Sequence, residues 1–203
     1  MPVPGMSNEL QIEYQDNAMI VRFTRPEIRN PLSVMVLDQL HEIVNDLCLR
    51  SEVEALIFTG TAGSFASGAD LREIAGISSE AAPDFARKGQ ELMTKIEELP
   101  QNTIAAINGF CFGGALDLTL ACDWRIASPD AKFAHPAAGL GIITGWGGTQ
   151  RLPRLIGQAN ALELFFTAEA INATRALAIG LVDELAEEPL VRAVEFLLPA
   201  DVG

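Results

Sequence analysis

Short apolar runs alternate with helix-like segments along most of this 203-residue chain, and this alternation limits its fold more than any other feature. The runs are rich in Val, Ile, Phe or Ala, and most are followed by turn residues, which is typical of buried strands. They cover Ala18–Thr24, Glu54–Gly60, Thr103–Gly109 and Trp124–Ser128. Strands that alternate with helices predict an α/β fold.

The helix-like segments carry recognisable start and stop signals. Ser33 is a good N-cap for a helix over Val34–Arg50, which has one apolar stripe. Asp84 is a candidate cap for a second helix, which Pro100 would stop. The remaining helices are expected to begin at the glycine pair Gly113–Gly114, after Gln158, after Asn172 and within Glu187–Leu198.

The most apolar window, Ile104 to Cys122, is long enough to raise the question of a membrane span. It contains Asn108, Asp117 and three glycines, and an aspartate in lipid is costly, so no spanning helix is predicted. The N-terminus has no basic segment followed by an apolar run, which argues against a signal peptide. We expect a loose leader over 1–16, one core domain over 17–185 and a short helical tail over 186–203.

Composition excludes several functional classes. With 27 acidic and 14 basic side chains the formal charge is -13, which argues against nucleic acid or a membrane surface as the main partner. Apolar residues make up 49% of the chain, enough for a sizeable core. Three cysteines without a CxxC pair, and only two histidines, predict reduced thiols, a cytoplasmic location and no metal site.

Two glycine-bearing segments that follow expected strands point to the chemistry. They are Ser64–Leu71 (SFASGADL) and Asn108–Leu118 (NGFCFGGALDL). A glycine pair at a helix start leaves backbone N–H groups without partners and lets a ligand approach closely. Such groups suit an oxygen that becomes negative during a reaction. Asp117 falls one turn after Gly114 on the same helix face, where a carboxylate can move a proton next to a carbonyl.

Several short motifs, taken in order, resemble the enoyl-CoA hydratase/isomerase family, or crotonase superfamily. Each motif is weak alone, and the specificity lies in their agreement along residues 18–185. The motifs are Val21–Asn30 (VRFTRPEIRN), Phe58–Gly60 (FTG), Phe65–Asp70 (FASGAD), Ala106–Gly109 (AING), Ala121–Ser128 (ACDWRIAS), Gly147–Arg154 (GGTQRLPR), Phe166–Ala173 (FTAEAINA) and Gly180–Asp183 (GLVD).

The resemblance implies a spiral of ββα units with a reduced C-terminal helical region, and binding of an acyl-CoA thioester. It implies two backbone N–H donors that hold the thioester oxygen as an enolate, here Ala69 and Gly114, with Asp117 as the matched acid/base. It implies no cofactor beyond the coenzyme A moiety of the substrate, and assembly as a trimer or hexamer. The predicted binding positions are Ile28, Arg29, Pro31, Ala66, Ala69, Asp70, Leu71, Gly113 and Gly114. Asp70 is also expected to cap the next helix, with Glu73 reaching back to it.

The acid–base residues depart from the family pattern. The family's hydratases carry a second carboxylate after the proline of a Phe-Gly-x-Pro-Glu motif, and here that segment reads Phe133-Ala-His-Pro-Ala137. Asp117 is also one methylene shorter than the usual Glu. Loss of one acid is expected to lower a hydration rate by ~10²–10⁴. His135 is a candidate substitute as a proton carrier.

Three functions stay open from the sequence alone. The first is an enzyme of the enoyl-CoA hydratase/isomerase class with Asp117 as sole matched acid/base. The second is a non-catalytic acyl-CoA-binding or assembly subunit, which Ala137 and the short stretch Glu184–Gly203 favour. The third is a scaffold domain without a ligand.

Overall fold

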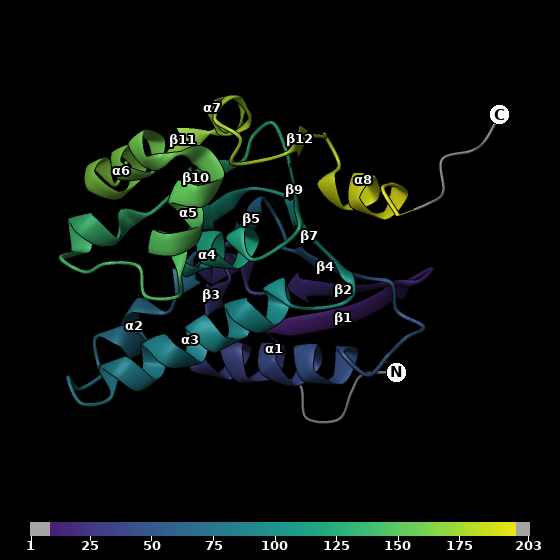
Figure 1. Cartoon of the computed structure of the whole chain (residues 1–203), viewed down its shortest axis with the longest axis horizontal. Helices are drawn as coiled ribbons and strands as arrows, with labels where there is room; N and C mark the ends of the chain where they lie inside the picture. The colour runs from purple at the N-terminus through teal and green to yellow at the C-terminus, as the bar shows by residue number, and fades with distance from the viewer. Residues whose placement is uncertain (1–8, 198–203) are drawn as a thin grey trace.

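The computed structural model describes residues 9–197 and shows a spiral built around a six-stranded sheet (Figure 1). The strands lie in the order β1-β2-β4-β7-β9-β12. The β1–β2 pair is antiparallel, and every other neighbouring pair is parallel. The bounds are β1 Leu10–Gln15, β2 Ala18–Phe23, β4 Ala55–Thr59, β7 Asn102–Ile107, β9 Trp124–Ala127 and β12 Glu184–Leu185.

A second, smaller sheet of short strands has the order β11-β10-β8-β5, and β3 pairs separately with β6. The strands β5, β8 and β10 come directly after β4, β7 and β9 in the chain. The helix α4 follows β8, the 3₁₀-helix η2 follows β10, and α2 follows β5 after the two-residue strand β6. This confirms the predicted succession of ββα units. The bounds are β3 Pro31–Leu32, β5 Ser64–Ala66, β6 Gly68–Ala69, β8 Phe110–Phe112, β10 Lys132–Ala134 and β11 Ile171–Asn172.

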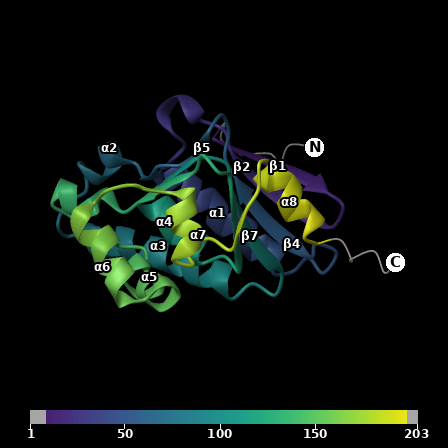
Figure 2. The same ribbon diagram turned by 90° about the horizontal axis from the view of Figure 1, so that it is seen from above.

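Helices cover both faces of the main sheet. The long helices α1 and α3 run side by side below it in Figure 1, and α5, α6 and α7 gather beside β10 and β11 (Figures 1 and 2). The α-helices are α1 Val34–Leu47, α2 Leu71–Ile74, α3 Ala82–Glu97, α4 Gly114–Leu120, α5 Gly148–Ile156, α6 Gln158–Thr167, α7 Ala173–Ala178 and α8 Pro189–Glu195. Two 3₁₀-helices, η1 Pro26–Ile28 and η2 Pro136–Leu140, complete the described chain.

Alternating residues of the main strands supply two apolar clusters, one on each face of the sheet. On β2, Met19 and Val21 belong to the larger cluster, which also takes the apolar stripe of α1. Ala18 and Ile20 face the opposite side, where Ala193 and Val194 of α8 cover them. The predicted tail over 186–203 therefore contains a helix that packs on the sheet, while its residues 198–203 lie outside the described part.

The first residues of the helices show which local sequence signals were sufficient to predict where a helix begins. Ser33 caps α1 as predicted, because its Oγ accepts a hydrogen bond from the N–H of Val36 at 3.2 Å. Asp84 does not cap α3, since the helix begins earlier, at Ala82, and Asp84 lies in its first turn, paired with Arg87. The reason is Pro83, whose fixed φ and missing N–H suit the first turn of a helix.

Part of the predicted leader belongs to the sheet. Residues 10–15 form β1, and all six pair with β2 from Leu10↔Phe23 to Gln15↔Ala18. Residues 1–8 lie outside the described part. The apolar window Ile104 to Cys122 divides into β7, β8 and α4. Over residues 9–197, no helix has both the length and the apolar character needed to cross a membrane.

Candidate active site

The two glycine-bearing segments identified in the sequence meet in space. Gly68, in β6, has a φ of +86°, and a Cβ built on it would lie 2.6 Å from the backbone nitrogen of Gly114. The same Cβ would lie 2.7 Å from the carbonyl oxygen of Phe112. Such distances are shorter than any real carbon contact, so only glycine allows the two chain segments to approach this closely.

Local backbone structure holds each segment in place. Pro31 pairs with Gly68, and Leu32 pairs with Ala69, which fixes β6 against β3. Gly113 donates its N–H to the carbonyl of Ala134 at 2.9 Å, which ties the start of α4 to β10. Gly114 is the first residue of α4, a position whose N–H has no acceptor within its own helix.

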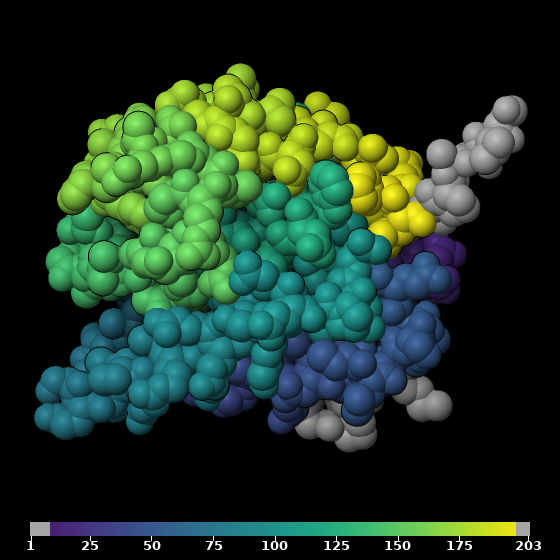
Figure 3. Space-filling view, in the orientation of Figure 1, coloured from purple at the N-terminus to yellow at the C-terminus, as the bar shows by residue number. Residues whose placement is uncertain are grey.

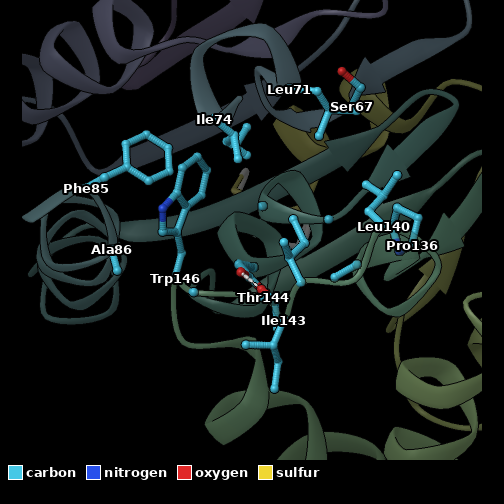
Figure 4. Close-up of a pocket in the computed structure, with 17 residues that line it drawn as sticks. Ser67, Leu71, Ile74, Phe85, Ala86, Pro136, Leu140, Ile143, Thr144 and Trp146 are labelled. Atoms are coloured by element: carbon cyan, nitrogen blue, oxygen red, sulfur yellow. Dashed lines mark hydrogen bonds between the residues drawn. The ribbon is translucent and has the colours of Figure 1, made fainter. Parts of the chain in front are cut away.

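A cavity of about 260 Å³ lies at this meeting point, where the segment around residues 136–146 meets α2 and α3 (Figure 4). Figure 3 shows the green part of the chain packed above the blue and teal segments that contain α2 and α3. Most lining side chains are apolar, and Asp117 is the one ionisable group among them. The lining residues are Ser67, Ala69, Leu71, Ile74, Phe85, Ala86, Gly113, Gly114, Asp117, Pro136, Ala137, Leu140, Ile142, Ile143, Thr144, Gly145 and Trp146.

The Asp117 carboxylate is fully buried and lines this cavity. Its Oδ2 accepts a hydrogen bond from the Thr144 hydroxyl, drawn as a dashed line in Figure 4, and the Trp146 backbone N–H also donates to the carboxylate. Among residues 9–197, its Oδ1 has no hydrogen-bond partner. Burial raises the pKa of Asp117 to about 7, and the Thr144 and Trp146 donors oppose this shift. A carboxylic acid with a pKa near neutrality can both take up and release a proton.

His135 lies against the free oxygen of Asp117, with its Nε2 3.5 Å from Oδ1. The imidazole is fully buried, and neither ring nitrogen has a hydrogen-bond partner in the described part of the chain. Burial lowers its pKa to about 4, so the ring is neutral at neutral pH. His135 also lines a second cavity of about 670 Å³, which extends over α5 and α6.

Gly148 allows this arrangement from the side of α5. A Cβ built on Gly148 would lie 2.0 Å from Asp117 Oδ1 and 3.2 Å from the Cε1 of His135. Neither the structural role of Gly148 nor the bond from Thr144 was predicted from the sequence. The Gly147–Gly148 pair before a helix was a usable signal for the first, whereas nothing near Thr144 marked it as a partner of Asp117.

The predicted binding residues divide into two groups. Ala69, Leu71, Gly113 and Gly114 line the cavity together with Asp117. The others do not line it: Ile28 and Arg29 lie at the end of η1, Pro31 lies in β3, Ala66 is fully buried in β5, and Asp70 precedes α2. The Arg29 guanidinium lies 5.2 Å from the centre of the Phe110 ring.

Asp70 caps α2, as expected, by accepting the N–H of Arg72 at 2.9 Å. The Arg72 side chain binds the same carboxylate, which holds the pKa of Asp70 below its usual range. The expected return bond from Glu73 is replaced by another, because the Glu73 carboxylate accepts the N–H of Val34 at 2.8 Å. Glu73 therefore serves the first turn of α1 rather than its own helix.

Within residues 9–197, no second carboxylate lines the cavity, and Ala137 occupies the position where the family pattern has one. Across residues 9–197, no group of three His, Cys, Asp or Glu side chains is placed to hold a metal ion. The chemistry that this arrangement can supply is proton transfer by one buried carboxylate beside two converging main-chain segments.

Comparison with known proteins gives a consistent picture. Residues 13–195 match a family model described as enoyl-CoA hydratase/isomerase. A crotonyl-CoA hydratase of Syntrophomonas wolfei is 40% identical over 177 residues, which are 87% of this chain and 68% of that protein. A short-chain-enoyl-CoA hydratase of Clostridium acetobutylicum is 39% identical over 181 residues, which are 89% of this chain and 69% of that protein. The chain thus spans about two thirds of the length of these relatives.

Solved structures agree with these sequence matches. The crystal structure of an enoyl-CoA hydratase from Bacillus anthracis matches with a TM-score of 0.89 and 36% identity, covering 93% of this chain and 75% of that one. Pseudomonas aeruginosa DspI matches with a TM-score of 0.88 and 31% identity, covering 95% of this chain and 79% of that one.

Proposed function

The chain belongs to the enoyl-CoA hydratase/isomerase family, and from this premise we propose that it moves a proton beside the carbonyl of an acyl-CoA thioester. The backbone N–H groups of Ala69 and Gly114 bind the thioester oxygen and stabilise its negative charge in the enolate. Asp117 is the acid/base that exchanges a proton with the acyl chain or with water. No cofactor is needed beyond the coenzyme A moiety of the substrate.

The observation that supports this proposal best is the position of Asp117. A lone buried carboxylate with a pKa of about 7 borders the same small cavity as Ala69 and Gly114. Burial of a carboxylate without a charged partner lowers the stability of the folded state. A buried position with only a structural role is therefore expected to carry an uncharged residue. A group kept at this cost in a cavity is a candidate for catalysis.

One carboxylate limits the range of reactions. Double-bond isomerisation needs a base that removes a proton at one carbon and returns it at another, which Asp117 alone can perform. Hydration also needs a water oriented for attack, and Ala137 provides no group for this. We therefore expect proton exchange and isomerisation to be faster than hydration.

The test is deuterium exchange, followed by mass spectrometry, from heavy water into butyryl-CoA, alongside hydration of crotonyl-CoA. We expect the purified protein to incorporate deuterium next to the carbonyl. Asp117→Asn should lose this exchange by ~10²–10⁴ while binding butyryl-CoA with unchanged affinity, measured by calorimetry. Binding without exchange in the wild-type protein would contradict the catalytic role of Asp117.

A non-catalytic acyl-CoA-binding subunit is the second candidate, and Ala137 is the observation that favours it. It predicts equal affinity for butyryl-CoA in the wild type and in Asp117→Asn, with no deuterium incorporated by either. The trimeric or hexameric state implied by the resemblance stays a prediction, and light scattering of the purified chain tests it.

A further inference from the structure

The indole of Trp146 is fitted between two helices at points where both carry glycine. A Cβ built on Gly89 of α3 would lie 2.1 Å from the indole Cδ1, and one built on Gly114 of α4 would lie 2.3 Å from Cζ3. Neither glycine has a φ in the left-handed region, so conformation does not demand glycine at either position. Glycine is needed at both positions because the indole occupies the space that a side chain would fill.

Further contacts fix the indole in this position. Trp146 is only 3% exposed, and the ring of Phe85 packs against it with centroids 5.7 Å apart (Figure 4). On the preceding residue, the carbonyl of Gly145 accepts a hydrogen bond from the Gln90 side chain of α3 at 2.7 Å. The indole is thus a rigid part of the cavity rather than a mobile cover.

The two ends of the cavity differ as a result. At the α3 end, the buried indole of Trp146 and the half-buried ring of Phe85 close it. At the other end, the cavity is lined by Leu140 and Ile143, which are 51% and 74% exposed to solvent.

The indole also lies directly on Gly114, which has a consequence for the bound acyl chain. If the N–H of Gly114 holds the thioester oxygen, the carbons attached to that carbonyl lie within the reach of the indole. An acyl chain that extends toward α3 meets a fixed aromatic ring, with backbone glycines behind it. Chain length is then limited by a side chain rather than by the sheet.

We infer that Trp146 is the specificity-determining residue of this cavity and that its substrates are short-chain acyl-CoA thioesters. The inference rests on the proposed function, because it needs the carbonyl to be held at Gly114. If Trp146 only packs the core, its removal lowers stability and slows the reaction equally for every chain length.

The experiment compares Trp146→Ala and Trp146→Leu with the wild type on crotonyl-, hexenoyl-, octenoyl- and decenoyl-CoA. Turnover is measured as kcat/KM and, independently of turnover, the affinity for the matching saturated acyl-CoA esters is measured by calorimetry. We expect the wild type to favour the crotonyl ester over the octenoyl ester by at least about 10-fold. Both variants should reduce this ratio by about 10-fold or reverse it.

Two further variants keep the test decisive. Trp124→Ala removes the other tryptophan, which packs on Phe196 at 4.8 Å outside the cavity, and should leave the chain-length ratio unchanged. Gly89→Ala pushes the indole toward the cavity, so it should lower the affinity for hexanoyl-CoA more than for butyryl-CoA. This variant retains the indole but displaces it, so it tests the inference even if Trp146→Ala does not fold.

The outcomes separate this inference from the function on which it rests. If the wild type binds or converts the esters and both Trp146 variants keep its chain-length ratio, the inference is overturned while the proposed function stands. If the wild type binds none of the esters, the proposed function fails and the inference fails with it.

Discussion

The cavity has two walls that are built from different kinds of atoms. One, the amide wall, is the main chain of Gly68–Ala69 and Gly113–Gly114, where side chains contribute little. The other, the acid–base wall, consists of the side chains of Asp117, Ala137 and Thr144, and His135 lies against Asp117 outside the lining. The amide wall depends on the path of the chain, so it tolerates few changes at glycine. The acid–base wall can change one side chain at a time without altering the fold, and Ala137 is such a change.

The largest expected effect comes from Gly68→Ala in the amide wall. The new Cβ would lie 2.6 Å from the Gly114 nitrogen, so one segment must move, and a displacement of about 1 Å lowers activity by ~10²-fold. Gly63→Ala is the matched control, because Gly63 also has a positive φ, +71°, but no atom lies within 4 Å of its Cβ. Both variants should lose ~1–3 kcal/mol of stability, measured by urea unfolding. If Gly68→Ala binds butyryl-CoA with the same affinity as the wild type, the close approach of Gly68 to Gly114 is not required for binding.

The next largest effect is a gain in the acid–base wall. Ala137→Glu adds the missing carboxylate beside Asp117 and should raise crotonyl-CoA hydration by ~10²-fold. Deuterium exchange into butyryl-CoA should change much less, since the proposed function assigns it to Asp117 alone. Ala138→Glu places the same charge on the exposed neighbour and serves as the control. An equal rise in both variants would point to a general charge effect.

Asp117→Asn should stabilise the protein in a pH-dependent way. The folded-state pKa of about 7 lies above the ordinary value of 3.8, so the folded state binds a proton more tightly than the unfolded state. The wild type therefore loses stability as pH rises toward 7, and the variant does not. Above pH 7 we expect the variant to be more stable by at least about 2 kcal/mol, measured by urea unfolding across pH. The surface change Asp130→Asn is the control, and an equal pH dependence in all three proteins would argue against the buried carboxylate.

The smallest expected effect is that of Thr144→Val. Loss of the hydroxyl removes a donor that favours the ionised form of Asp117, so the pKa of Asp117 should rise further. Deuterium exchange at neutral pH should fall by about 10-fold, and the midpoint of its pH profile should move upward. Thr144→Ser keeps the donor and should restore the wild-type profile. A uniform loss at every pH would indicate a packing defect instead.

The same division explains what the sequence could predict. Ser33, the Gly113–Gly114 pair and the period of the strands are local signals, and they led to α1, α4 and the ββα units. Helix α5 was missed because Gly147, Gly148 and an internal Pro153 disfavour a helix locally. The burial of Leu152 and Ile156 outweighs that preference in the folded chain.

For the site, the glycines and Asp117 could be predicted because family motifs mark them along the chain. The bond from Thr144 to Asp117 joins residues 27 positions apart, and the contacts of Trp146 with Gly89 and Gly114 cross three elements. No local pattern encodes such pairings. They depend on how the segment after η2 folds back over α4.

The Glu73–Val34 bond links the lining of the cavity to a distant helix start. Leu71 and Ile74 of α2 face the cavity, while Glu73, between them, satisfies a backbone amide of α1. Any outward swing of α2 that admitted a bulkier ligand would leave that amide without its acceptor. Outward motion of α2 and opening of the first turn of α1 are therefore coupled. The hydrogen-exchange rate of the Val34 amide then reports how often α2 moves away from the cavity.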